Sequence, residues 1–467
     1  MKRVAIVGGG IAGLSAAFYL EQHRRRGAAL QYTLYEASPR LGGVIQTERT
    51  SDGFLVEAGP DSFLSEKPWA RDLCRDLGIE DQIIGSNDAS RQTWILVGGH
   101  LHPLPDGLQF LVPTRLWPIL TAGLFSLGTK LRIAAEYFER PRAAAGDESA
   151  AAFVERHFGR EMVERLVDPL LAGVYGGEAS RLSARAVLPR LVALEEKYGS
   201  LARGILQSRN PQPNPAAPGT IFTTPRGGMQ QLVDTLVTRL DPASLRPGVA
   251  VRGLARHDAS WRVETAQGIE NFDTVILAIP AFAAAELLEQ SSAELSTRLK
   301  QIPYSSSVTV ALGYDAAQVT MGGRKLPGGF GFLVPRSEGR RMLACTFVHN
   351  KFSGRVPAGG LLLRAFFGGS TDEAALTLSD DGVLRVARQE LSEILGLAAE
   401  PSFVRIYRWP RAMAQYEVGH LERVADIESL RRTLPGLHLI GNAYAGIGVP
   451  DCVRMGKEAA DASLRDN

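Results

Sequence analysis

The feature that most restricts the fold of this chain is its opening stretch, RVAIVGGGIAGLSAAFYL, at residues 3–20. Its apolar start predicts a buried strand, followed by a glycine-rich turn and an apolar helix. Gly8, Gly10 and Gly13 match the GxGxxG pattern. Such glycines allow a tight turn, close approach of a pyrophosphate and close packing of the helix on the strand. The start of the helix would then offer free N–H groups and a partial positive charge to phosphate.

The segment after this helix has the features of a second strand. QYTLYE ends at Glu36, which lies 23 residues beyond Gly13. A carboxylate at this distance can accept a hydrogen bond from a ribose hydroxyl. The two strands and the helix between them therefore predict a nucleotide-binding βαβ unit. A βαβ unit with a purely structural role is the alternative.

A second glycine-rich stretch, GNAYAGIGVPDC at residues 441–452, follows an apolar run near the C-terminus. Gly446 and Gly448 would let this loop lie close to a ligand. Pro450 suits the first turn of a helix, where its missing N–H costs nothing, and Asp451 favours a helix start. Taken alone, the stretch fits an ordinary strand–turn–helix connection equally well.

Composition limits the class of protein. The chain has 467 residues, enough for roughly two or three domains, and a formal net charge of only +2, which argues against nucleic-acid binding. Cys74, Cys345 and Cys452 form neither a CxxC zinc pattern nor an even disulfide set, so we expect a reducing compartment. The first strand begins near Arg3, which leaves no room for a targeting segment, and we expect a cytoplasmic protein.

Further motifs give the chain a family resemblance. ASPRLGGVIQT, GFLVEAGPDSF, TTPRGGMQQLVDTL and FDTVILAIP resemble the amine-oxidase-type FAD superfamily. Within it, EAGPDSFLSEKPWARDLCRDLGI, GGHLHPLP, RWPRAMAQYEVGH and GIGVPDCVRMGKEAA resemble the porphyrinogen oxidases of heme biosynthesis. Two departures from amine oxidases agree with this. Val44 stands where those enzymes carry a second arginine, and the C-terminal loop lacks their aromatic-rich approach to the flavin.

This resemblance implies an α/β and α+β fold with three parts. A discontinuous Rossmann-like FAD-binding domain would comprise residues 1–88, 220–300 and 404–467. A β-sheet substrate domain would comprise residues 301–403. Residues 89–219 would form a helical insertion that makes one wall of the substrate cleft and, as one option, contacts a membrane.

The resemblance also implies noncovalent FAD and a set of cofactor-binding residues. Arg40 is expected to pair with phosphate, Val251 to touch the adenine and Trp409 to lie beside the flavin, although Trp409 could instead be an aromatic buried under the final helix. The last helix would point its N-terminus at the ring, where negative charge develops on reduction. The full set is Gly8, Gly10, Ile11, Ala12, Gly13, Glu36, Ala37, Arg40, Gly42, Gly43, Gly59, Pro60, Asp61, Ser62, Val251, Trp409, Ile447, Gly448 and Val449.

Substrate contacts are expected in the middle of the chain. Lys67 and Arg91, with Lys197 as a weaker candidate, could pair with the substrate's propionates, but such residues are more often solvated charges. Candidates to line the cavity are Phe330, Phe332 and Leu333, for which ordinary sheet-core packing is the alternative.

The activity implied is a six-electron oxidation of coproporphyrinogen III or protoporphyrinogen IX to the porphyrin, with O2 as acceptor and H2O2 as product. A missing arginine in the segment that holds Thr93 favours coproporphyrinogen. The alternatives are a flavin amine oxidase, a carotenoid-type desaturase or a non-enzymatic flavoprotein. We assign no catalytic acid or base and no metal, because His100 and His102 lack a third ligand nearby.

Partners and location are expected from the same resemblance. The apolar stretch Leu116–Leu127, flanked by Arg115 and Lys130, is too short to span a bilayer, but it could lie at a membrane surface or be a core helix. We therefore expect a cytoplasmic enzyme with peripheral contact at the inner face of the membrane as an option. A homodimer and hand-over of product to the next heme-pathway enzyme are further expectations.

Overall fold

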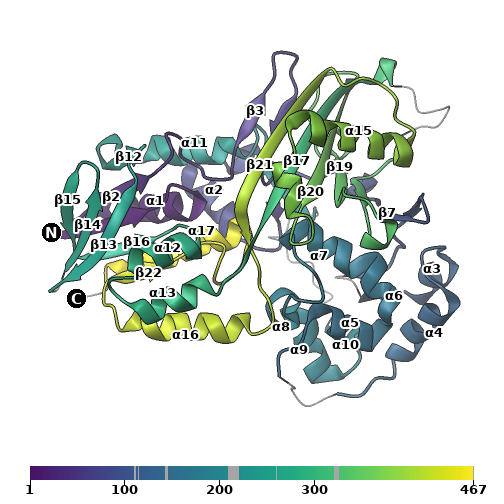
Figure 1. Ribbon diagram of the computed structural model, residues 1–467, viewed down its shortest axis with the longest axis horizontal. Coiled ribbons are helices and arrows are strands. Elements are labelled where there is room, and N and C mark those ends of the chain that lie inside the picture. Colours follow the sequence, from purple (N-terminus) through teal and green to yellow (C-terminus); the bar gives the residue numbers. More distant parts are fainter. Residues whose placement is uncertain are drawn as a thin grey trace.

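Three regions make up the molecule in the computed structural model, which describes residues 1–109, 112–113, 115–141, 146–208, 220–258, 260–319 and 326–465 (Figure 1). A parallel sheet flanked by helices lies on one side, with both termini beside it. A larger sheet and a group of helices lie on the other side. Within the predicted insertion at 89–219, residues 110–111, 114, 142–145 and 209–219 fall outside the described residues.

The first region is built on parallel strands in the order β12-β2-β1-β16-β22. Val4, Ala5 and Ile6 of the central strand β1 are completely buried, as expected for a parallel sheet with helices on both faces. The predicted strand ending at Glu36 is confirmed. The bounds are β1 (Lys2–Val7), β2 (Leu30–Glu36), β12 (Leu245–Pro247), β16 (Thr274–Leu277) and β22 (Leu437–Leu439).

Helices α1 (Ile11–Arg25) and α17 (Val449–Ser463) pack against each other, so the two ends of the chain meet beside this sheet (Figure 1). Their contact is close because Gly456 has no side chain. A Cβ atom there would lie 2.5 Å from the Ala12 carbonyl oxygen and 2.9 Å from Ser15 Cβ. The glycine therefore lets the middle of α17 pack directly on the first turns of α1.

Other helices and short strands complete this region. Its core includes side chains from α2 (Trp69–Leu77), α11 (Gln230–Arg239), α12 (Ala281–Leu288), α13 (Ala293–Lys300) and α16 (His420–Arg432). The small sheets are β3 (Thr47–Arg49) with β4 (Leu55–Glu57), then β5 (Phe63–Leu64), β11 (Phe222–Pro225) and β6 (Ile83–Gly85), and finally β13 (Val251–His257), β14 (Ser260–Thr265) and β15 (Gly268–Phe272).

The larger sheet has the strand order β21-β17-β20-β19-β18-β7-β8. One face is covered by helix α15 (Asp380–Leu395), whose Val383, Ala387 and Leu391 are buried in the same core as the sheet. The bounds are β21 (Phe403–Ala414), β17 (Tyr304–Asp315), β20 (Gly360–Gly368), β19 (Ala344–Phe347), β18 (Gly331–Leu333), β7 (Thr93–Val97) and β8 (His100–Pro103); the short helix α14 (Val348–Lys351) follows β19.

The strands of this sheet cross two of the segment boundaries predicted from the sequence. Strands β7 and β8 fall within residues 89–219, which we expected to be helical, yet they extend the sheet: β7 pairs with β18, and β8 pairs with β7. Strand β21 crosses the predicted boundary at residue 403 and carries the sheet on to Ala414. Both differences arise because strand pairing joins segments that are far apart in the sequence.

The remaining helices form the insertion, which lies below the larger sheet (Figure 1). The single helix considered for Leu116–Leu127 is wrong, because α3 ends at Thr121 and α4 begins at Leu127. None of the described helices is long and apolar enough to cross a membrane. The bounds are α3 (Leu116–Thr121), α4 (Leu127–Glu136), α5 (Ala150–Phe158), α6 (Arg160–Met162), α7 (Asp168–Tyr175), α8 (Ala184–Val187), α9 (Pro189–Tyr198) and α10 (Leu201–Ser208), with strands β9 (Leu108–Gln109) and β10 (Val112–Pro113).

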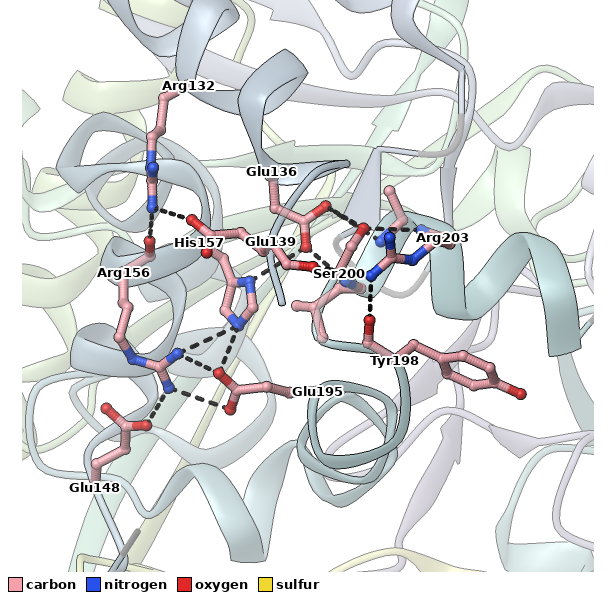
Figure 2. A network of polar contacts seen from close by, with 12 residues as sticks. Arg132, Glu136, Glu139, Glu148, Arg156, His157, Glu195, Tyr198, Ser200 and Arg203 are labelled. Atoms are coloured by element: carbon pink, nitrogen blue, oxygen red, sulfur yellow. Dashed lines mark hydrogen bonds and ion pairs between the residues drawn. The ribbon is translucent and has the colours of Figure 1, made fainter. Parts of the chain in front are cut away.

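A buried ionic network holds the insertion together (Figure 2). His157 on α5 lies between two carboxylates, with Nδ1 3.2 Å from Glu136 and Nε2 3.2 Å from Glu195. Arg156 donates to Glu195 and also pairs with Glu148. Because both ring nitrogens of His157 face carboxylates, the doubly protonated imidazolium satisfies both contacts.

The same network caps the start of α10. Glu136 is completely buried and accepts hydrogen bonds from the Ser200 hydroxyl at 3.0 Å and from the backbone N–H of Leu201 at 2.5 Å. A buried carboxylate is costly unless it is paired in this way. Burial alone would lower the pKa of His157, but the hydrogen bonds that its ring donates to Glu136 and Glu195 raise it. Burial would likewise raise the pKa of Glu195, but His157 and Arg156 lower it to about 2.

Replacing Gly456 by Val is expected to lower the free energy of unfolding by about 1–3 kcal/mol or more, because the side chain would push α17 away from α1. Urea denaturation followed by circular dichroism measures this change. Gly128→Ala in α4 is the control, since the nearest atom to a Cβ there is Ser126 Oγ at 4.0 Å. Equal stability of the two variants would contradict the close helix contact.

Replacing His157 by Gln is expected to flatten the pH dependence of stability. The raised pKa means that the imidazolium stabilises the fold fully below the unfolded value of about 6.5, and that this is lost as pH rises through the higher folded pKa. The wild-type protein should lose about 1–3 kcal/mol of unfolding free energy over that rise. His257→Gln, at a 62% exposed side chain, should keep the wild-type slope; an unchanged slope in His157→Gln would refute the role.

Candidate nucleotide site

The first turn of the chain is shaped by its glycines. Gly8 has φ +108°, and a Cβ there would lie 2.4 Å from the Ala278 carbonyl oxygen. A Cβ at Gly13 would lie 2.0 Å from the Gly8 carbonyl oxygen. A Cβ at Gly10, in contrast, would meet nothing within 4 Å. The protein's own packing thus requires glycine at two positions, while Gly10 leaves open space where a pyrophosphate can approach.

The start of α1 is available to an anion. Its N-cap residue, Gly10, has no side chain to accept a hydrogen bond from the first turn, and that turn contains no acidic residue. Ile11 and Ala12 are buried and hold the helix against the core. Orphan N–H groups and the positive end of the helix dipole therefore face the open space beside Gly10.

Glu36, the carboxylate predicted to bind a ribose hydroxyl, lies at this turn. Glu36 accepts a hydrogen bond from the Gly9 N–H at 2.7 Å and from the Ser38 N–H at 2.8 Å. Val251 begins β13 near the end of β2, since the neighbouring Val249 donates to the Glu36 carbonyl at 2.9 Å. The structure thus gathers the glycine turn, the acid and the predicted adenine neighbour in one place.

The loop formed by residues 40–43 (RLGG) lies directly on the glycine turn at residues 8–13. The Gly42 N–H donates to the Gly9 carbonyl at 2.8 Å, and a Cβ at Gly43 would lie 3.2 Å from Gly10 Cα. Arg40 donates to the carbonyl oxygens of Leu41 and Ile45, at 3.0 and 2.7 Å, and also to that of Gly43. The guanidinium therefore fixes its own loop, and its pairing with phosphate stays a prediction, as do contacts of the exposed Ala37.

The segment Gly59–Ser62 is held by side chains from the larger sheet and α14. Arg364 donates to the Gly59 carbonyl at 2.6 Å. Lys351 pairs with Asp61 at 2.9 Å. Burial would raise the pKa of Asp61, but Lys351 and Arg364 hold it well below its usual range. These charges stiffen the predicted cofactor segment, which includes Pro60.

Trp409 joins this segment from strand β21. Its indole N–H donates to the Ala58 carbonyl at 2.9 Å, and its side chain is only partly buried. Trp409 therefore lies beside Gly59 on the sheet, whereas the alternative expectation put it under the final helix. Whether it contacts the flavin stays a prediction.

The C-terminal loop ends at the start of α17, as predicted from Pro450 and Asp451. Gly446 has φ +117°, and a Cβ there would lie 2.4 Å from Asp451 Cγ. Asp451 accepts from the Gly448 N–H at 3.2 Å and pairs with Lys67 at 2.6 Å. Ile447 and Val449 complete this turn at the start of α17.

The predicted substrate residues lie in different environments. The side chain of Lys67 is 39% exposed and forms an ion pair with Asp451, so a substrate propionate would compete with Asp451 for the ammonium group. Arg91 is exposed just before β7. Lys197 is exposed on α9, with its ammonium 5.1 Å from the Tyr198 ring centre. Their roles in substrate binding remain predictions.

The prediction for Phe332 is wrong. This ring is 1% exposed and packs with Phe347 in the core between the sheet and α15. Because strand side chains alternate between faces, Leu333 points the other way, toward the insertion, with its Cδ2 4.0 Å from a Cβ built at Gly173. Leu333 and the partly buried Phe330 remain candidates for a cavity wall.

Sequence reasoning missed the buried acid Glu57, which ends β4 two residues before Gly59. Glu57 is 2% exposed and accepts hydrogen bonds from Thr47 Oγ1 at 2.7 Å and from the Met229 N–H at 2.9 Å, at the start of α11. Burial raises its pKa to about 7. A carboxylate inside the apolar run LVEAG was the available signal, but its partners come from distant segments.

Among the residues described, no three His, Cys, Asp or Glu side chains gather where they could hold a metal ion. His100 and His102 both lie on β8. The geometry therefore offers an anion-binding turn, a second helix start and ion-paired supports.

Replacing Gly10 by Val is expected to give folded but colourless protein. The backbone at Gly10, with φ −72°, suits valine, and the side chain would enter the space expected for the pyrophosphate. Flavin absorbance of purified protein and circular dichroism measure the two effects. Gly13→Val should instead fail to fold stably, because of the clash with Gly8. A fully flavinated Gly10→Val protein would contradict binding of the pyrophosphate at this turn.

Comparison with known proteins agrees with this geometry. The family model for flavin containing amine oxidoreductases matches residues 11–464. Coproporphyrinogen III oxidase from Bacillus subtilis is 35% identical over 99% of this chain and 98% of that protein. Protoporphyrinogen oxidase from Homo sapiens is 31% identical over 99% of this chain and 98% of that protein. The crystal structure of a protein from Exiguobacterium sp. 255-15 has 32% identity and a TM-score of 0.88, covering 100% of this chain and 99% of that one. These matches make the chain a flavin-dependent oxidoreductase, and it belongs to the flavin containing amine oxidoreductase family, in its porphyrinogen oxidase group.

Proposed function

We propose that the protein oxidises a porphyrinogen to the corresponding porphyrin in heme biosynthesis, with noncovalent FAD as cofactor, O2 as acceptor and H2O2 as product. The observation that carries this proposal is the full-length similarity to coproporphyrinogen III oxidase of Bacillus subtilis. The open glycine turn and the second helix start support a dinucleotide rather than a mononucleotide, because they can hold a diphosphate and a ring at separate places.

Coproporphyrinogen III is the substrate we favour. The relative from Bacillus subtilis and the one from Staphylococcus aureus both carry its name. In this chain, the strand that holds Thr93 has no arginine, which also favours that substrate. A substrate with more carboxylates needs more cationic partners, and Arg91 lies exposed beside this strand.

The protein's own residues would bind and orient the cofactor and the substrate. The bound FAD would accept two electrons in each of three cycles. Gly8, Gly10 and Gly13 would hold the diphosphate, and Glu36 would bind the ribose in place of its contact with Gly9. The N-terminus of α17 would stabilise negative charge that develops at the ring. The insertion and the larger sheet would exclude water from the substrate.

Noncovalent attachment is supported by the state of the thiols. Cys452 lies in the first turn of α17, is 6% exposed, and burial raises its pKa to about 12. Cys74 and Cys345 are also buried and free of disulfides. Since a covalent link to flavin would need an accessible thiolate, none of these residues suits it.

Peripheral membrane contact and a cytoplasmic location belong to the same proposal. Trp117, Leu127, Leu131 and Phe138 on or just after α3 and α4 are 75%, 73%, 62% and 78% exposed. Apolar side chains of this kind beside Lys130 and Arg132 would suit an anionic interface. A homodimer and product hand-over remain expectations from the resemblance.

Purified protein is expected to convert coproporphyrinogen III faster than protoporphyrinogen IX, with about three H2O2 molecules formed per porphyrin. Porphyrin fluorescence and a peroxide assay measure both quantities. A primary amine substrate is the control for the amine oxidase alternative. Peroxide release with the amine, or no bleaching of the flavin by either porphyrinogen under nitrogen, would refute the proposal.

A further inference from the structure

One short segment contacts both the insertion and the C-terminal loop. We call this segment, Gln415–His420, the junction; it runs from the end of β21 to the first residue of α16. The backbone N–H of Ser183 donates to the Tyr416 carbonyl at 2.7 Å. In return, the Gly419 N–H donates to Asp147 at 2.9 Å. The junction is thus tied to two segments of the insertion.

Asp147 strengthens this attachment because its carboxylate accepts hydrogen bonds from both the junction and the insertion. Its second oxygen accepts from the Ser183 hydroxyl at 2.9 Å, and Ser183 is completely buried. An ion pair of 2.8 Å joins Arg181 to Glu417 at the outer edge. The insertion therefore cannot shift without moving the backbone around Tyr416.

The side chain of Tyr416 points the other way, to the loop before α17. Its hydroxyl donates to the Asn442 carbonyl at 2.9 Å and accepts from the Gly446 N–H at 3.0 Å. A single hydroxyl therefore closes the turn that leads to Gly448, the N-cap of α17. Without it, a carbonyl and an N–H group in a partly buried turn would lose their partner.

The pocket around Tyr416 fixes the ring. Tyr416 is 3% exposed and stacks on His420, with ring centres 3.9 Å apart and planes at 13°. Tyr175, at the end of α7, lies 5.9 Å away on centroids. Burial raises the pKa of Tyr416 and lowers that of His420 to about 4, so both are neutral near pH 7. The hydroxyl thus keeps its proton and can donate and accept at once.

We infer that Tyr416 is a positioning residue for the flavin: it sets the loop ahead of α17 and couples this loop to the wall of the substrate cleft. The inference rests on the proposed placement of the flavin ring at the start of α17. It assigns Tyr416 no direct contact with the substrate.

The test is Tyr416→Phe, which deletes the hydroxyl and leaves the ring. We expect FAD to bind about tenfold more weakly and the two-electron potential to become more negative, because the helix start would stabilise the reduced ring less well. Fluorescence titration of apo-protein and equilibration with reference dyes measure these two quantities. The turnover number should fall while the KM for porphyrinogen stays unchanged.

Tyr32→Phe is the matched control. Tyr32 is also 3% exposed, and its hydroxyl donates to Glu21 at 3.2 Å, in β2 away from the C-terminal loop. This variant should lose a similar amount of stability but keep wild-type FAD affinity and potential. Wild-type affinity and potential in Tyr416→Phe, or the same changes in both variants, would overturn the inference.

A second variant covers the case in which Tyr416→Phe does not fold. Asp147→Asn loosens the junction from the insertion side, and we expect a smaller negative shift of the potential. An unchanged potential in this folded variant would overturn the coupling. FAD affinity and potential are measured without porphyrinogen, so these results stand apart from any failure of the proposed substrate.

Discussion

The close crossing of α1 and α17 is the contact on which the site depends. The N-terminus of a helix can stabilise an anion only if it points at that anion. Here two helix N-termini, those of α1 and α17, come from opposite ends of the sequence. Gly456, in the middle of α17, allows this helix to pack directly on the start of α1, because a Cβ atom there would lie 2.5 Å from the Ala12 carbonyl oxygen. The glycine turn before α1 and the loop before α17 are thereby attached to two helices that pack on each other.

Around this crossing, the supports come from distant segments and carry charge. Lys351 and Arg364 stiffen the chain at Asp61, and Lys67 is paired with Asp451. Such buried or half-buried pairs add little net stability, but they fix geometry, since breaking one leaves an unpaired charge. We therefore regard them as supports that hold the cofactor segments in place, and not as catalytic groups.

The sequence predicted the parts of the structure that depend on local pattern. The glycine turn, the strand ending at Glu36 and the helix starting at Val449 are confirmed because spacing and turn chemistry determine them. Alternation in strand β18 places Phe332 and Leu333 on opposite faces, but only α15, far downstream, decides which face is the core. The roles of β7, β8 and Tyr416 depend on pairing over long sequence distances, which no local pattern contains.

Burial of the thiols has a consequence for the lifetime of the enzyme. With the proposed H2O2 product, the enzyme would be exposed to an oxidant of its own making, and oxidation begins at the thiolate. Burial raises the pKa of Cys74 and Cys452 to about 12 and that of Cys345 still further, so thiolate is scarce even beside the flavin site. Chemical durability over many turnovers is thus built into the same packing that forms the core.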